Sequence, residues 1–303
     1  MQSDIHKKFI LSPIINILRD SVTACKGVGC GIETQSLGEY VLQTTFLKMT
    51  GASEQKLKCI CWEIATNDYD YRYLYLKKNY GECSSYTDKN NIYNDLIKLI
   101  VEQSPAFSTN RLFDDVNLNE KTDELIEFLL KENQEKIEKN KKRKLTDEET
   151  QKLAEEIETK FKNKGLSERE RAKFSRILLF EEIQDRLMRI VGNTLIVQWD
   201  QRNYLNYIKA WKTLSNGNFA IDKMLFDKDL ENFYTRVVYS HRNRCAHNLI
   251  SYQNNLPTLK TLTEDGFVYD NYYFRFSMLI LLDEIFIRLY KACVKTVEQE
   301  YWT

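Results

Sequence analysis

Apolar residues recur at intervals of three and four positions along much of the chain, which is the spacing of an α-helix that faces a hydrophobic core. One such stripe consists of Leu57, Ile60, Cys61, Ile64 and Ala65. Ser53 precedes this stripe and is the expected N-cap of its helix. Residues 92–101 have the same helical character. Tyrosines alternate with other residues over 69–76, so this segment suits either a short strand or a helix.

The same periodicity predicts four helices in the second half of the chain, one of them over 200–214. An earlier one carries the stripe Ile177, Phe180, Ile183, Leu187 and Ile190. A later one carries Leu230, Phe233, Tyr234, Val237, Val238 and His241. The last is expected over 272–298, with the stripe Leu282, Ile285, Phe286, Leu289 and Cys293. Glycines and a proline predict loops at 26–31 and 254–266.

Residues 119–173 interrupt this pattern. Residues 135–144 are polar on every side of a helix, and two capping boxes follow, starting at Thr146 and at Ser167. We therefore predict a charged helical insertion whose tip is the turn near residues 140–145. Four consecutive basic residues lie at this tip, namely Lys141, Lys142, Arg143 and Lys144. They could contact RNA phosphates or a partner protein, or they could form a solvated tip with no partner.

The fold class follows from this pattern and from the scarcity of helix breakers. The 303 residues include only 10 Gly and 3 Pro, and 43% of them are hydrophobic, which is enough for a sizeable core. We predict an all-α protein, a helical bundle with a charged helical insertion. The expected parts are an N-terminal helical part of unassigned role over 1–118, the insertion over 119–173, and a helical domain over 174–303.

Charge and cysteine usage narrow the class of protein. Lys+Arg and Asp+Glu are both 44, so no overall field attracts nucleic acid or a membrane. The apolar run 276–282 is short and is followed by Asp283 and Glu284, so we expect no membrane span. The chain starts without a signal-peptide pattern, and its seven cysteines predict free thiols in the cytoplasm. Cys59 and Cys61 would point in different directions on a helix, which argues against zinc, and we expect no metal or cofactor.

Two of the three histidines lie in one short segment, Ser240–Asn248, late in a predicted helix. Asn243 and His247 are four residues apart and share one helix face. Arg242 lies five residues before His247, about 140° around the axis, and its long side chain can still approach the imidazole. His241 continues the apolar stripe, so we expect it to be a buried residue with satisfied hydrogen bonds.

These residue types suit the cleavage of RNA by its own 2′-hydroxyl, which requires neither a metal nor a protein nucleophile. Histidine transfers protons near neutral pH, and arginine holds a phosphate and stabilises the charge of the transition state. One histidine is only half of an acid–base pair. A homodimer would bring two copies of Arg242 and His247 into one composite site across a two-fold axis.

The segment also resembles a known family. Residues 242–248, Arg-Asn-Arg-Cys-Ala-His-Asn, are similar to the Arg-x4-6-His motif of the HEPN superfamily, and the helical context extends the resemblance over about 174–298. The resemblance implies a helical bundle that dimerises through the motif and acts as an endoribonuclease in anti-phage or toxin systems. It implies that Arg242 and His247 are catalytic and that Asn243 supports them. Asn248 and Arg244 are further candidates for contact with RNA.

Two other hypotheses remain open at this point. One is a non-catalytic helical module that binds RNA, a nucleotide or a partner protein, which predicts binding without cleavage. The other is a structural dimerisation protein whose charged insertion holds the partner. A regulatory protein or RNA is a further possible partner of the enzyme.

Overall fold

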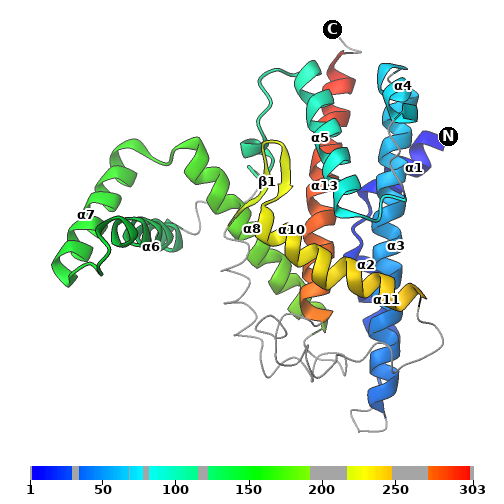
Figure 1. The fold of residues 1–303 in the computed structure, drawn as a ribbon, viewed down its shortest axis with the longest axis horizontal. Helices are drawn as coiled ribbons and strands as arrows, with labels where there is room; N and C mark the ends of the chain where they lie inside the picture. Colours follow the sequence, from blue (N-terminus) through cyan, green and yellow to red (C-terminus); the bar gives the residue numbers. More distant parts are fainter. Residues whose placement is uncertain are drawn as a thin grey trace.

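The computed structural model describes residues 2–28, 34–67, 69–77, 82–114, 122–191, 217–247 and 272–300. Helices dominate this part of the chain, and its only sheet is a two-stranded hairpin. The prediction of an all-α helical bundle is therefore confirmed (Figure 1). The predicted helix at 200–214, the predicted loop at 254–266 and Asn248 lie outside the described residues.

Five helices form the N-terminal part of the bundle: α1 (Gln2–Leu11), α2 (Ile15–Ala24), α3 (Gln35–Asn67), α4 (Tyr69–Lys77) and α5 (Tyr86–Gln103). A short 3-10 turn, η2 (Thr109–Arg111), follows them. Pro13 lies between α1 and α2, where its missing N–H breaks no helical hydrogen bond. The ambiguous tyrosine-rich segment is the helix α4.

The prediction that Ser53 caps a helix is wrong, because α3 runs through that position. Phe46 and Met49, two turns and one turn earlier, are fully buried, as are Leu57 and Ile60 after it. The side of α3 that faces the core is therefore continuous across Ser53. Packing of this continuous face outweighs the local capping preference of a serine.

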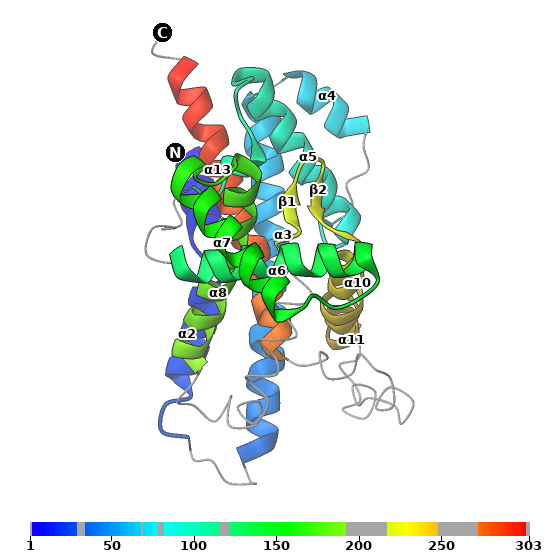
Figure 2. The same cartoon turned by 90° about the vertical axis from the view of Figure 1, so that its left-hand side faces the viewer.

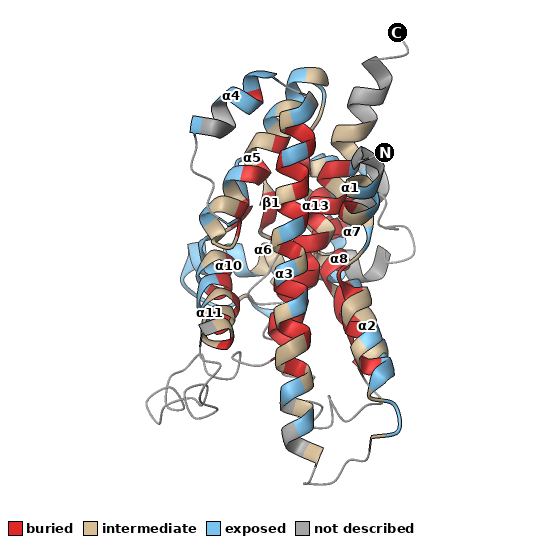
Figure 3. Ribbon diagram, turned by 90° about the vertical axis from the view of Figure 1, so that its right-hand side faces the viewer, coloured by how far each residue is buried: buried red, intermediate tan, exposed pale blue. Residues whose placement is uncertain are grey.

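The long C-terminal helix α13 (Tyr272–Glu300) is the centre of the bundle, and its prediction is confirmed. From Tyr272 to Tyr290 nearly every side chain is buried, because α3, α5 and α8 all contact this helix. Figure 3 shows that buried residues recur along α3 and make up much of this central helix. A helix that is apolar on all sides must be covered on all sides, and the other helices provide that cover.

The charged insertion forms the helices α6 (Thr122–Lys141) and α7 (Asp147–Lys164), which stand away from the bundle in Figure 1 and lie in front of it in Figure 2. Both predicted capping boxes are present: Glu149 and Thr146 exchange side-chain to backbone hydrogen bonds, as do Glu170 and Ser167. The insertion has a small core of its own, formed by Leu129, Ile157, Phe174 and Leu178.

Helix α8 (Glu168–Val191) connects the insertion to the bundle. Its first turns contribute to the insertion core, and Phe180, Ile183 and Leu187 enter the main core as predicted. The main core also contains residues from Ile10 to Phe113 and from Phe219 to Tyr290. The parts of the chain predicted as 1–118 and 174–303 thus share one core.

A β-hairpin that the sequence did not predict precedes the motif segment. Strands β1 (Phe219–Ile221) and β2 (Met224–Phe226) pair antiparallel, with Phe219 opposite Phe226 and Ile221 opposite Met224. Helix α5 anchors the hairpin, since the Tyr93 hydroxyl donates to the Ile221 carbonyl at 3.0 Å. This anchor fixes the start of the next helical segment.

That segment consists of α10 (Lys228–Phe233), the π-helical turn η5 (Tyr234–Tyr239) and α11 (Ser240–His247). The stripe predicted from Leu230 to His241 is buried at every position, as expected. Arg275 on α13 donates from Nε to the Val237 carbonyl at 3.2 Å within the π turn. No helix in the described part of the chain is long and apolar enough to cross a membrane.

Candidate functional site

Helix α11 carries the predicted motif and packs against α3 through His241. The imidazole of His241 lies against Phe46 of α3, with ring centroids 5.1 Å apart, and its Nε2 is 3.3 Å from the Tyr272 hydroxyl. Burial, together with Arg275 and Arg244, lowers the pKa of His241 to about 2. His241 is therefore a neutral core residue, as predicted, and cannot exchange protons with a substrate at neutral pH.

Arg242 points away from this core contact and is partly exposed. Its Nη1 donates to Asn243 Oδ1 at 3.2 Å, and its Nη2 donates to Glu54 Oε2 on α3 at 3.1 Å. The side chain of Arg242 is 25% exposed and that of Glu54 is 15% exposed. The guanidinium is thus held by an amide from its own helix and by a carboxylate from α3.

Glu54 is a residue of this site that the sequence analysis missed. It lies 188 residues before Arg242, and no motif connects the two positions. Only the packing of α11 against α3 brings the carboxylate and the guanidinium together.

Arg242 and Glu54 line a small hollow between α3, α5 and α11, with room for about one water molecule. Lys89 of α5 also lines it and is almost fully buried. The Lys89 ammonium donates to the carbonyls of Cys83 and Ser84 at 2.6 and 3.0 Å. Burial lowers the pKa of Lys89 to about 8, while the charge of Glu54 acts in the opposite direction.

Helix α11 carries two other predicted residues of the motif, His247 and Arg244. His247 is the last residue of α11, and its side chain lies outside the described part of the structure. Arg244 is half-buried, and its Nη2 lies 3.5 Å from Nδ1 of His241, on the core side of the helix. The structure therefore brings Arg242 and Asn243 together and directs Arg244 towards His241.

The four basic residues predicted to bind RNA lie apart from the motif. Lys141, Lys142, Arg143 and Lys144 are all exposed at the α6–α7 turn, while α11 lies on the other side of the bundle (Figure 1). Glu149 pairs with Arg143 through two hydrogen bonds of 2.7 and 2.9 Å and with Lys141 at 3.0 Å. These contacts lower the pKa of Glu149 and offset part of the positive charge at the tip.

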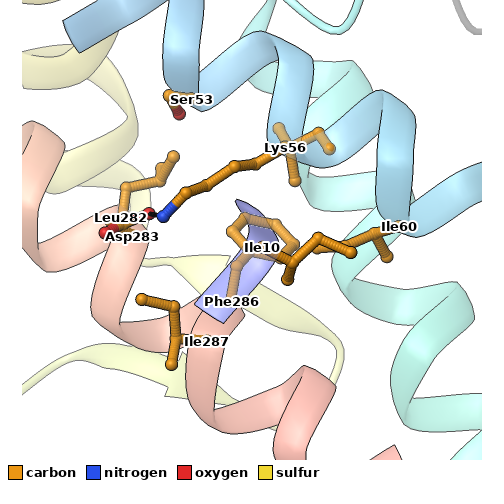
Figure 4. Close-up of a pocket in the computed structure, with 9 residues that line it drawn as sticks. Ile10, Ser53, Lys56, Ile60, Leu282, Asp283, Phe286 and Ile287 are labelled. Atoms are coloured by element: carbon orange, nitrogen blue, oxygen red, sulfur yellow. Dashed lines mark hydrogen bonds and ion pairs between the residues drawn. The ribbon is translucent and has the colours of Figure 1, made fainter. Parts of the chain in front are cut away.

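A second polar group lies deeper, between α1, α3 and α13 (Figure 4). Lys56 Nζ donates to Asp283 Oδ1 at 2.6 Å and to the carbonyl of Ser12, while the Ile14 N–H donates to Asp283 Oδ2 at 2.8 Å. Burial raises the pKa of Asp283 to about 6 and lowers the pKa of Lys56. Most of the surrounding side chains are apolar, such as Ile10 and Phe286, so this pair joins three helices within the core.

Among the described residues, no group of three or more His, Cys, Asp or Glu could hold a metal ion. The cysteines in this part of the chain are free thiols. Comparison with protein-family models, with curated proteins and with solved structures finds no match for this chain.

Proposed function

We propose that the protein is a metal-independent endoribonuclease that cleaves RNA by attack of the 2′-hydroxyl on the adjacent phosphate. In this proposal Arg242 binds the phosphate, His247 transfers a proton, and Asn243 orients Arg242. The products are a 2′,3′-cyclic phosphate and a free 5′-hydroxyl. By the motif resemblance, we further propose a role as an effector in anti-phage defence or as a toxin, under the control of a partner protein or RNA.

The observation that carries this proposal is the partly exposed guanidinium of Arg242, at the mouth of a small hollow that Glu54 and Lys89 also line. Arginine side chains on a surface are ordinary, but this one is oriented by two hydrogen bonds that fix its plane. A guanidinium of fixed orientation can present paired donors to a phosphate with little further loss of side-chain entropy.

The proposed active form is a homodimer. His241 is excluded as a proton-transfer group by its burial, so each chain contributes His247 alone from this segment. Two copies of α11 facing each other across a two-fold axis would supply two Arg242 and two His247 to one cleft. Such an interface would be isologous and would bury the partly exposed face of α11.

The test is incubation of the purified full chain with total RNA in EDTA. Wild type is compared with Arg242→Ala, with His247→Ala and with Arg236→Ala, a matched control because Arg236 is an exposed arginine of the preceding turn. We expect fragments ending in 2′,3′-cyclic phosphate from the wild type and the control only. The oligomeric state of each protein is measured by light scattering.

Two results would contradict the proposal. Cleavage that requires a metal ion and survives both substitutions would show a different active site. RNA binding without cleavage, weakened by the same substitutions, would instead support a non-catalytic binding module.

A further inference from the structure

RNA cleavage by a 2′-hydroxyl moves two protons, one away from the attacking oxygen and one onto the leaving 5′-oxygen. The motif segment supplies only His247 for these proton transfers, since His241 is buried and neutral. The third histidine of the chain, His6, lies on α1 and pairs with Glu63 at 2.9 Å. A second proton-transfer group within one chain must therefore be something other than histidine.

The carboxylate of Glu54 lies beside Arg242 and is a candidate for this second proton-transfer group. Its Oε2 lies 3.1 Å from the Arg242 guanidinium, and both side chains are accessible to solvent. Among the described residues that line the hollow, Glu54 is the one carboxylate. A phosphate bound by Arg242 would thus bring its ribose close to a proton acceptor.

A purely structural role explains this contact less well. A partly exposed ion pair contributes only about 0–1 kcal/mol to stability. Helix α11 is already attached to α3 by the buried contact between Phe46 and His241. Lys89, the buried cation in the same hollow, interacts electrostatically with Glu54. Glu54 would therefore keep a nearby positive charge when a phosphate engages Arg242.

We propose, on the basis of the ribonuclease function proposed above, that Glu54 is the general base of the Arg242 site. The Glu54 carboxylate accepts the proton of the ribose 2′-hydroxyl as its oxygen forms a bond to phosphorus. The bond between phosphorus and the 5′-oxygen breaks, and the departing oxygen takes a proton from the protonated His247. The products are a 2′,3′-cyclic phosphate, a 5′-hydroxyl, protonated Glu54 and neutral His247.

This assignment changes one part of the function proposed above. The base comes from α3 of the same chain, and a second copy of His247 is no longer needed for proton transfer. Dimerisation would then serve RNA binding, by bringing two Arg242 side chains into one cleft.

The experiment compares Glu54→Gln, Glu54→Asp and the matched control Glu82→Gln. Glu82 is an exposed carboxylate that pairs with Lys58 of α3, so its substitution removes the same charge away from Arg242. Cleavage of a short RNA in EDTA is followed across acidic and neutral pH, and kcat and KM are measured separately. Thermal unfolding confirms that each variant is folded.

We expect Glu54→Gln to lower kcat by roughly 100- to 10,000-fold with little change in KM. It should also abolish the rise of kcat/KM with pH on the acidic side, because the titrating base is gone. Glu54→Asp should keep this rise at reduced kcat, and Glu82→Gln should behave as wild type. If Glu54→Gln lowers activity but keeps the acidic rise, Glu54 only positions Arg242 and the proposal is overturned.

A second substrate separates the base from the acid. RNA with sulfur in place of the 5′-bridging oxygen has a better leaving group, which needs no protonation. This substrate should restore cleavage by His247→Ala and should leave Glu54→Gln slow. Cleavage that depends on Arg242 and His247 but not on Glu54 overturns this inference alone, whereas no cleavage by the wild type overturns the ribonuclease function as well.

Discussion

The buried pair formed by Lys56 and Asp283 gives the sharpest test of how this fold is held together. Both side chains are almost inaccessible, at 6% and 4% exposure, and the ammonium and carboxylate are 2.6 Å apart. Asp283→Asn keeps an acceptor for the Ile14 N–H but leaves the Lys56 ammonium without its counter-charge. Removal of one partner from a buried pair typically costs about 3–5 kcal/mol of unfolding free energy, and we expect a loss in this range.

The double variant Lys56→Met/Asp283→Asn should recover most of this loss. Burial raises the pKa of Asp283 from 3.8 to about 6, so ionising the carboxyl in the folded chain costs about 3 kcal/mol relative to the unfolded chain. Because the folded-state pKa is raised, this contribution to stability is present below pH 3.8 and is lost as the pH rises to about 6. With both charges removed, stability at pH 7 should lie within about 1 kcal/mol of the wild type.

The assay is urea unfolding followed by far-UV circular dichroism at pH 4 to 7 for the wild type, both single variants and the double variant. Glu102→Gln is the control, because it breaks the exposed pair of Lys98 and Glu102 and should change stability by no more than about 0.5 kcal/mol. A loss below about 1 kcal/mol for Asp283→Asn would mean that the pair behaves as a surface pair. A double variant as unstable as Asp283→Asn would show that charge balance is not the cause.

Three further predictions concern single positions. Gly217→Ala should lower the unfolding free energy by more than about 1 kcal/mol, because Gly217 has φ +70° and an added Cβ would lie 2.9 Å from a backbone oxygen. Gly51 lies within α3, where an added Cβ meets open space, so Gly51→Ala should raise the unfolding free energy by about 0.5–1 kcal/mol. Both changes are measured by urea unfolding. Thr146→Ala and Ser167→Ala each remove a helix cap and should cost about 0.5–2 kcal/mol in the same assay, and no change would show that these exposed caps are idle. His241 should stay neutral down to about pH 4 in NMR titration, because its pKa in the folded chain is about 2. Because this pKa is lowered from 6.5, the related stability is present above pH 6.5 and is lost at about 1.4 kcal/mol per pH unit as the pH falls below that value. A titration midpoint near 6.5 would contradict the burial of His241.

Local periodicity predicted α8, α13 and the helical segment that leads into the motif. The stripe from Leu230 to His241 is buried as expected, and the burial of His241 followed from its place on that stripe. The π turn at Tyr234–Tyr239 was not predicted, because spacings of three and four describe an α-helix and contain no sign of a wider turn. The hairpin at Phe219–Phe226 was also missed, because strands of three apolar residues do not alternate for long enough to be detected.

Contacts between distant segments were beyond prediction. Glu54 meets Arg242 across 188 residues, and Lys56 meets Asp283 across 227 residues. In a single sequence a glutamate or a lysine on a long helix looks like any solvated charge. The motif itself could be found because Arg242, Asn243 and His247 are close in sequence, whereas their partner on α3 needed the packed structure.

Glu54 and Lys56 show how one helix can serve both the proposed site and the core. They are two residues apart on α3, about 200° around the helix axis, so one faces α11 and the other faces α13. Glu54 and Lys56 share no hydrogen-bond partner in the described contacts. The effects of substituting them on the unfolding free energy should therefore be nearly additive. Glu54→Gln should lower cleavage with little loss of stability, whereas Lys56→Met should lower stability and leave the kcat of the folded fraction unchanged. If Lys56→Met also lowered kcat in protein shown to be folded, α3 would couple the core to the site, and Glu54 could not be assigned a chemical role from its own substitution alone.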